Sequence, residues 1–160
     1  MKESLFSILG AAVDDAVVLD LFAGTGALGL EALSRGAKQL VLVEHDRQAL
    51  VALKKNVTTV GGSTIEILPM SAERALKTLS QRGLRFDLVF IDPPYEAQLW
   101  ETSLAALAAM QLVRDAGIVV CEHPGRDTPP APPDPWQIMT TRRYGDVALT
   151  LYAVAKGVTP

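Results

Sequence analysis

Short apolar runs alternate with longer amphipathic stretches along most of the chain. The short runs have the length and the β-branched content of buried strands, whereas the stretches between them carry apolar residues at helical spacing. We predict strands at 17–21, 39–43, 65–68, 86–91 and 117–121, and helices from 26, across 46–60, at 72–82 and across 96–112. Strands that alternate with helices in this way predict an α/β fold with a doubly wound parallel sheet.

The pattern changes after Glu122. Residues 124–135 contain six of the ten prolines, and we expect them to form a surface loop. Two further apolar segments, Gln137–Thr141 and Val147–Val154, predict a hairpin at the edge of the sheet. The predicted helices should end at glycines, as C-caps do: Gly36, Gly61-Gly62, Gly83 and Gly117.

Composition agrees with one compact domain over residues 1–160. The chain is 49% hydrophobic, but no stretch is long and apolar enough to span a membrane. We see no secretory signal pattern, and the single cysteine, Cys121, cannot form an internal disulfide, so we expect a cytoplasmic protein with a buried core thiol. His45 and His123 lack the spacing of metal ligands, so no metal is expected.

A glycine-rich turn follows the first predicted strand. Gly24, Gly26 and Gly29 spell G-x-G-x-x-G, and Glu44 follows the next strand in the place of a ribose-binding acid. This pattern alone is compatible with a dinucleotide oxidoreductase. Asp20 argues against that reading, because a fixed negative charge beside the glycine turn would repel a pyrophosphate and attract a ligand that carries an ammonium or sulfonium group. Asp20 could instead be an N-cap or turn residue.

The segment Asp92-Pro93-Pro94-Tyr95 follows the strand at 86–91, where an α/β sheet builds its active site. Consecutive prolines end the strand and leave the carbonyls of Asp92 and Pro93 to accept hydrogen bonds, while Tyr95 offers a flat face for stacking. This combination suits the exocyclic amino group of a planar base. The same four residues could form no more than a rigid turn.

These motifs resemble those of class I S-adenosylmethionine-dependent methyltransferases that modify amino nitrogens of nucleobases. The block from Lys2 to Leu9, the run from Leu19 to Ala37 and the late Tyr144-Gly145-Asp146 are similar to the RsmD family. The resemblance implies a Rossmann-like seven-stranded sheet with an antiparallel last strand, S-adenosylmethionine as cofactor and N2 of a guanine in 16S ribosomal RNA, naked or in the small ribosomal subunit, as the target. It also implies that the N-terminal helix, residues 1–12, lies over the cofactor site.

The resemblance assigns roles to individual residues. Asp20 and the glycine-turn amides should order the methionine end of the cofactor, and Glu44 should accept both ribose hydroxyls. Ser71-Ala72 stands where the family binds the adenine amino group, with Met70 as another possible contact. The expected cofactor site is Asp20, Phe22, Ala23, Gly24, Gly26, Glu44, His45, Ser71, Ala72 and Asp92.

The catalytic residues expected from the resemblance are Asp92, Pro93, Pro94 and Tyr95. Hydrogen bonds from the guanine amino group to Asp92 and to the Pro93 carbonyl should localise the nitrogen lone pair, and Tyr95 should stack on the base. Asp92 could also cap a helix that starts near Glu96.

Charge fits RNA binding poorly, because the net charge is −3 and the isoelectric point is about 5.3. Arg126 and the Arg142-Arg143 pair beside Tyr144 are the clusters that could contact a phosphate backbone. The family normally carries a basic N-terminal segment before the block that begins at Lys2, and we expect this segment to be absent here. We expect a monomer and leave three alternatives open: an adenine-N6 methyltransferase, an NAD-linked oxidoreductase and a non-catalytic assembly factor.

Overall fold

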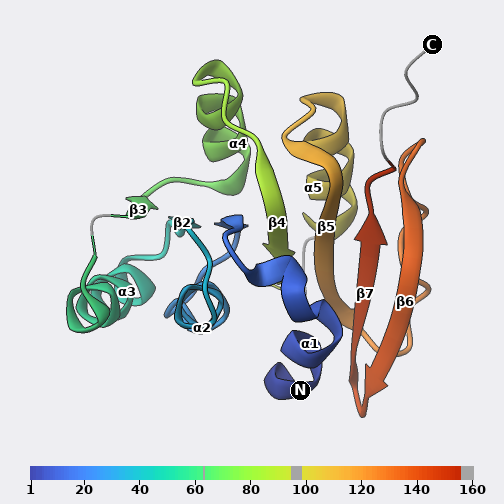
Figure 1. Cartoon of the computed structure of the whole chain (residues 1–160), viewed down its shortest axis with the longest axis horizontal. Coiled ribbons are helices and arrows are strands. Elements are labelled where there is room, and N and C mark those ends of the chain that lie inside the picture. The colour runs from blue at the N-terminus through green and yellow to red at the C-terminus, as the bar shows by residue number, and fades with distance from the viewer. Residues whose placement is uncertain (63, 95–98, 156–160) are drawn as a thin grey trace.

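The computed structural model describes residues 1–62, 64–94 and 99–155, which form a seven-stranded sheet with helices on both faces (Figure 1). The sheet order is β3-β2-β1-β4-β5-β7-β6. Strands β1 to β5 pair in parallel, whereas β7 is antiparallel to both β5 and β6. The doubly wound sheet with an antiparallel last strand is therefore confirmed. The strands are β1 (Val17–Asp20), β2 (Gln39–Val43), β3 (Ile65–Leu68), β4 (Phe86–Ile91), β5 (Val113–Pro124), β6 (Gln137–Tyr144) and β7 (Val147–Ala153).

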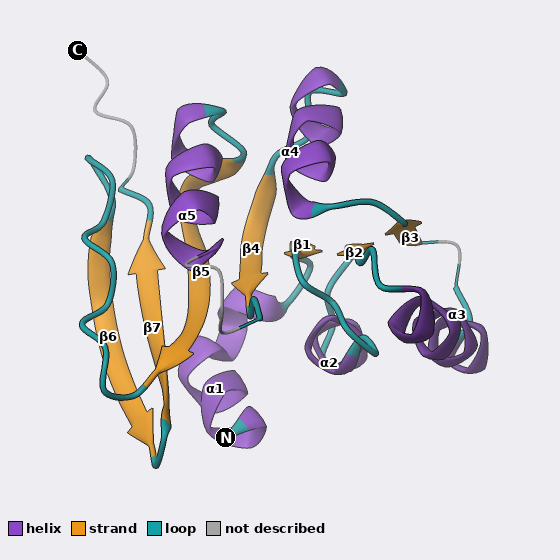
Figure 2. Ribbon diagram, turned by 180° about the vertical axis from the view of Figure 1, so that it is seen from behind, coloured by secondary structure: helices purple, strands orange, loops and turns teal. Residues whose placement is uncertain are grey.

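The helices cover the two faces of the sheet in separate groups. They are α1 (Lys2–Leu9), the 3-10 helix η1 (Gly10–Val13), α2 (Ala27–Ser34), α3 (Arg47–Val60), α4 (Ala72–Gln81) and α5 (Leu99–Ala109). One core joins the sheet to α1, α2 and α3 through Phe6, Ala32 and Leu53, and a second joins it to α4 and α5 through residues such as Leu79 and Leu107. Figures 1 and 2 show the same division from opposite sides. None of the described helices has the length and apolar character needed to cross a membrane.

Strand β5 begins earlier than its sequence pattern predicts. Arg114 and Asp115 interrupt the apolar run, and this interruption hides the start of the strand at Val113. Gly117 therefore lies inside β5 and does not end a helix, so that prediction was wrong. A Cβ atom at Gly117 would lie 2.8 Å from the Arg114 carbonyl oxygen, which explains why a glycine is needed in this irregular part of the strand.

The proline-rich stretch forms an irregular loop that runs beside β6 (Figure 2). Part of the loop is buried: Pro130 is covered by the protein, and its carbonyl accepts a hydrogen bond of 2.8 Å from the Tyr152 hydroxyl. Trp136, at the end of the loop, packs into the core on the α4 and α5 side of the sheet. The loop therefore anchors the β6–β7 hairpin as well as forming surface.

Candidate active site

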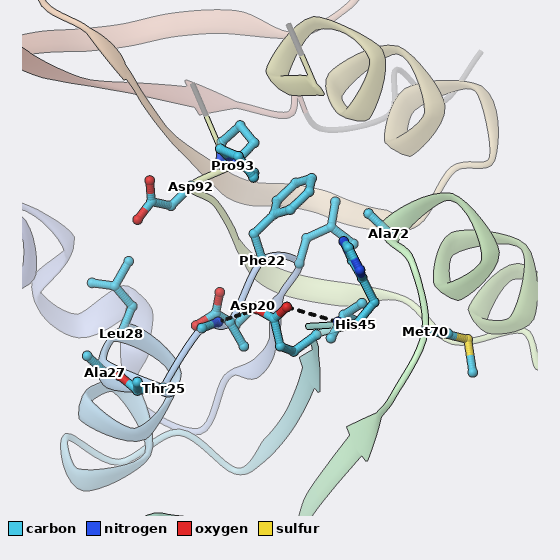
Figure 3. A pocket seen from close by; sticks show the side chains of 16 residues that line it. Asp20, Phe22, Thr25, Ala27, Leu28, His45, Met70, Ala72, Asp92 and Pro93 are labelled. Atoms are coloured by element: carbon cyan, nitrogen blue, oxygen red, sulfur yellow. Dashed lines mark hydrogen bonds between the residues drawn. The ribbon is translucent and has the colours of Figure 1, made fainter. Parts of the chain in front are cut away.

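A cavity of about 430 Å³ lies at the carboxyl ends of β1, β2 and β4. Parallel strands end at the same edge of a sheet, so residues far apart in the sequence meet there. The cavity is lined by Asp20, Leu21, Phe22, Ala23, Gly24, Thr25, Ala27, Leu28, Val43, Glu44, His45, Met70, Ala72, Asp92, Pro93 and Pro94 (Figure 3). Most of the predicted cofactor and catalytic residues therefore surround one space.

The glycine turn connects β1 to α2 and forms one wall of the cavity. Gly24 and Gly26 have φ angles of 57° and 91°, which side chains rarely adopt. Gly26 does not line the cavity; a Cβ there would lie 2.7 Å from Cδ1 of Leu53, so its role is to let the turn pack against α3. Sequence reasoning missed Thr25, Ala27 and Leu28, which follow the turn and line the same wall.

Asp20 is 2% exposed, and its Oδ2 atom accepts a hydrogen bond of 3.1 Å from the Gly29 backbone N–H. The pKa of Asp20 is raised from 3.8 to about 7, mainly by burial; the nearby charges of Asp92 and Glu44 contribute to this rise, and the Gly29 bond opposes it. The carboxyl group is thus not the fixed negative charge that the sequence argument assumed, but a group that titrates near neutral pH.

Glu44 joins two loops of the cavity. Its Oε1 atom accepts from the Gly24 N–H at 2.8 Å, and its Oε2 atom accepts from the N–H groups of His45 and Asp46, each at 2.9 Å. We expected two free oxygens, but a carboxylate oxygen has about two acceptor sites. Oε2 is therefore fully used by the backbone, and one acceptor site remains on Oε1.

Ser71 and Ala72, the pair predicted to contact the adenine ring, have different positions in the structure. Ser71 is the N-cap of α4, and its hydroxyl accepts from the Arg74 N–H at 3.3 Å; Ser71 does not line the cavity. Met70 and Ala72 on either side do line it. Figure 3 shows the Met70 side chain pointing away from the other labelled residues, and its sulfur accepts a hydrogen bond of 3.9 Å from the hydroxyl of Thr78 in α4. Phe22 and Ala72 are among the apolar residues that line the cavity and offer surface to a flat ring.

Asp92, Pro93 and Pro94 follow β4 directly and line the cavity, with Asp92 half-buried and Pro93 buried. Tyr95 and Glu96 lie outside the described residues, so the stacking role of Tyr95 and the capping role of Asp92 stay predictions. The strand register places Ile91 beside Cys121 of β5, and Glu122 therefore follows next to Asp92. Ile91 and Cys121 both pack on the α4 and α5 side, so the residues that follow them project to the opposite face, and the carboxyl groups of Asp92 and Glu122 are neighbours there.

Sequence reasoning missed Glu122. It is half-buried, and burial together with the contact with Asp92 raises its pKa to about 8. A carboxylate at the end of a strand, like Asp92, is the signal that could have identified it. Using that signal requires knowing that β5 is the neighbour of β4, and this is a tertiary relationship.

Helix α1 packs beside the site without lining it. Phe6 is buried against Phe90, Lys2 forms an ion pair of 3.3 Å with Glu31 of α2, and the Ser4 hydroxyl is 2.6 Å from that of Tyr144. No residue of 1–12 is among the lining residues of the cavity, and its covering role stays a prediction. Among the described residues, no cluster of three His, Cys, Asp or Glu side chains is arranged to hold a metal ion.

The arginines of the hairpin have different environments. Arg143 donates to the Gly125 carbonyl and so ties the hairpin to the loop after β5. Arg142 is exposed and pairs in register with Leu149, which belongs to the core on the α1 side. Because paired residues project to the same face of a sheet, Arg142 lies on the face that carries α1.

Comparisons with known proteins place this geometry in a family. The family model described as "Conserved hypothetical protein 95" matches residues 1–153. The Ribosomal RNA small subunit methyltransferase D of Escherichia coli (strain K12) is 34% identical over 152 residues, which cover 95% of this chain and 75% of that protein. A solved structure of a conserved hypothetical protein from Streptococcus pyogenes has a TM-score of 0.87 and 36% identity, with 96% of this chain and 95% of that chain covered.

A more distant structure shares the fold alone. It is an RNA methyltransferase from Salinibacter ruber in complex with S-adenosyl-L-homocysteine, with a TM-score of 0.71 and 16% identity over 99% of this chain and 92% of that chain.

Proposed function

The chain belongs to the RsmD family of ribosomal RNA small subunit methyltransferases, and we propose that it transfers a methyl group from S-adenosylmethionine to the exocyclic N2 of a guanine in 16S ribosomal RNA. The observation that carries this proposal is the joint position of Asp20 and Asp92. Asp20 ends β1, Asp92 directly follows the adjacent strand β4, and both line one cavity, so a site for a cationic ligand and an acceptor for an amino group lie side by side.

The residues of the cavity fit S-adenosylmethionine. A volume of about 430 Å³ suits a small ligand, since such sites span about 300–1,000 Å³. Asp20 pairs with the cationic methionine end of the cofactor. The remaining acceptor site on Oε1 of Glu44 is available to a ribose hydroxyl. Phe22 and Ala72 supply apolar surface for the adenine ring.

The cofactor supplies a sulfonium methyl group, whose transfer to nitrogen breaks the S–C bond, forms an N–C bond and leaves a positive charge that departs as a proton to water. Asp92 accepts one N–H of the substrate amino group, and the Pro93 carbonyl accepts the other. These bonds orient the amino nitrogen and draw its lone pair out of the conjugated ring. The carboxylate of Asp92 also stabilises the positive charge that develops on the nitrogen.

The RNA contacts proposed for this chain are local. Arg142 lies on the α1 face of the sheet near its carboxyl edge, and the exposed Arg126 lies on the loop after β5. Each can bind a phosphate group on a path that leads to Asp92. The whole chain is acidic, with a net charge of −3, so an assembled small subunit that offers further contacts is a better substrate than naked RNA.

The test is transfer of a tritiated methyl group from S-adenosylmethionine to 30S subunits and to naked 16S RNA, both from cells that lack the endogenous enzyme, followed by nucleoside analysis. We expect N2-methylguanosine, with more product from the subunits. N6-methyladenosine would establish the adenine-specific alternative. Cofactor binding in calorimetry without any methylated nucleoside would favour a non-catalytic assembly role.

A further inference from the structure

Glu122 occupies a position in β5 that matches the position of Asp92 after β4. Ile91 pairs with Cys121 in the parallel register, so the next residues on the two strands are Asp92 and Glu122. Val120 packs in the core on the α1 side, and Glu122 follows two residues later on the same face. Asp92 lines the cavity, whereas Glu122 does not. Glu122 therefore reaches the site through Asp92.

The two carboxyl groups are neighbours on one face of the sheet, and a hydrogen bond between them would require a proton. Two ionised carboxylates are acceptors only and repel each other, so neighbouring carboxyl groups are hydrogen-bonded only when one of the pair carries the proton. Burial is the main cause that raises the pKa of Glu122 to about 8, and the contact with Asp92 and the negative charge of Asp92 act in the same direction. At neutral pH Glu122 is the protonated partner.

The charged and titratable groups around Asp92 and Glu122 are consistent with a proton on Glu122. Asp20 at the end of β1 is a carboxyl group whose own pKa is raised to about 7, so it brings no positive charge to the pair. The flanking residues of β5 point to the other face, where Cys121 is in the core and His123 is bonded to Thr150. On the same face β7 presents Leu149 opposite Glu122, and β6 presents the exposed Arg142 beyond it. Helix α1 directs its charged Lys2 toward Glu31.

We propose that Glu122 is a positioning residue: it keeps a proton, donates it to one oxygen of Asp92 and so holds the other oxygen toward the substrate amino group. This inference rests on the proposed methyl transfer, because it concerns the residue that accepts the amino N–H. The arrangement gives Asp92 one fixed orientation without neutralising it. A carboxylate that is already oriented loses less conformational freedom when the substrate binds.

Two substitutions separate a positioning role from its alternatives. Glu122→Gln keeps the size of the side chain and donates an amide N–H to Asp92, so kcat should stay within about threefold of the parent value. Glu122→Leu keeps the volume but has no donor, and kcat should fall about 10- to 100-fold, as expected for a lost hydrogen bond to a charged group. The KM for S-adenosylmethionine should change little in both variants. Glu101→Gln on the exposed side of α5 is the matched control and should behave as the parent protein does.

The pH profile gives a second readout. In the parent protein kcat should fall as the pH rises through about 8, because Glu122 ionises and the two carboxylates repel each other. Glu122→Gln cannot ionise, so this fall should disappear. If Glu122→Gln is as inactive as Glu122→Leu while both variants melt like the parent, Glu122 is needed as a base and the proposal is overturned.

An infrared difference spectrum tests the proton without any substrate. Subtracting the spectrum of Glu122→Gln from that of the parent at pH 7 should leave the C=O band of one protonated carboxyl group, since contributions from Asp20 cancel. A carboxylate band in its place would overturn the proposal. If the protonated band is present but the parent methylates no RNA, the proposed function fails while the assignment of the proton stands.

Discussion

Gly24 donates its backbone N–H to Oε1 of Glu44 over 2.8 Å, and this bond joins the glycine turn after β1 to the end of β2. One side chain thereby shapes the cavity and offers an acceptor to its ligand. Replacing Glu44 with Ala should weaken S-adenosylmethionine binding about 10- to 100-fold, the scale of one lost hydrogen bond to a charged group. Calorimetry measures this directly, and Glu44→Gln, which keeps one carbonyl oxygen, should lie between Ala and the parent. Unchanged affinity in Glu44→Ala would mean that the ribose contact is misplaced.

The pKa of Asp20 predicts that cofactor affinity depends on pH. Burial raises this pKa to about 7, so the free protein must release a proton before Asp20 can pair with a cationic ligand. Affinity for S-adenosylmethionine should rise by up to about tenfold per pH unit below pH 7 and level off above it. Titrations in two buffers of different ionisation enthalpy would detect the released proton. Asp20→Asn should bind more weakly and without this pH dependence; a parent protein whose affinity is constant across the range would refute the pairing.

The same raised pKa affects stability in the absence of ligand. The folded state keeps the proton of Asp20 up to a higher pH than the unfolded state does. The stabilisation that comes from this proton is complete below the ordinary pKa of 3.8, declines above it and is lost as the pH rises through about 7. Chemical denaturation across this window should show a declining contribution in the parent protein. Asp20→Asn should show a smaller decline, and an equal decline in both proteins would argue against the buried titration.

Gly29 lets helix α2 approach the sheet closely. A Cβ atom there would lie 2.7 Å from Cδ2 of Leu42 and 2.9 Å from Cδ1 of Leu40, both buried side chains. Gly29→Ala should lower the free energy of unfolding by about 1–3 kcal/mol through overpacking. Denaturant unfolding measures the loss. Ser34→Ala at the exposed end of the same helix is the control and should change stability by no more than about 0.5 kcal/mol.

We predict that Arg142 of the β6–β7 hairpin contributes to the salt dependence of RNA binding. Arg142→Ala should weaken binding to every RNA sequence and reduce the slope of log affinity against log salt by about one, as expected for one lost phosphate contact. Filter binding over a range of salt concentrations would show this. Lys77→Ala, on α4 and paired with Glu73, is the control on the other face of the sheet. Equal effects of the two variants would place the RNA path elsewhere.

The sequence predicted the fold well where short apolar runs hold no more than one polar residue. The strands at 39–43, 65–68 and 86–91 have the predicted bounds because the single polar residue in each, Gln39, Glu66 or Asp87, leaves the apolar run recognisable. The start of β5 was missed because Arg114 and Asp115 lie within the strand where it is irregular. Local pattern carries no information about such an irregularity, which depends on the neighbouring strand.

The candidate site was predictable in outline and not in its electrostatics. Asp20, Glu44 and Asp92 each end a predicted strand, and the cavity brings all three together. The partnership of Asp92 with Glu122 depends on strand order, and the titration of Asp20 near neutral pH depends on burial. Ser71 was chosen by its position in a motif, whereas its hydroxyl caps α4. A local hydrogen bond of this kind competes with any contact to a ligand.

The most direct test of the central claim is methyl transfer to small ribosomal subunits by Asp92→Ala, measured beside the parent protein with S-adenosylmethionine binding recorded for both. Asp92→Ala should bind the cofactor nearly as the parent does and lose about 100-fold or more of its transfer rate, because the acceptor for the amino N–H is gone. Full transfer by Asp92→Ala with normal cofactor binding would contradict the account.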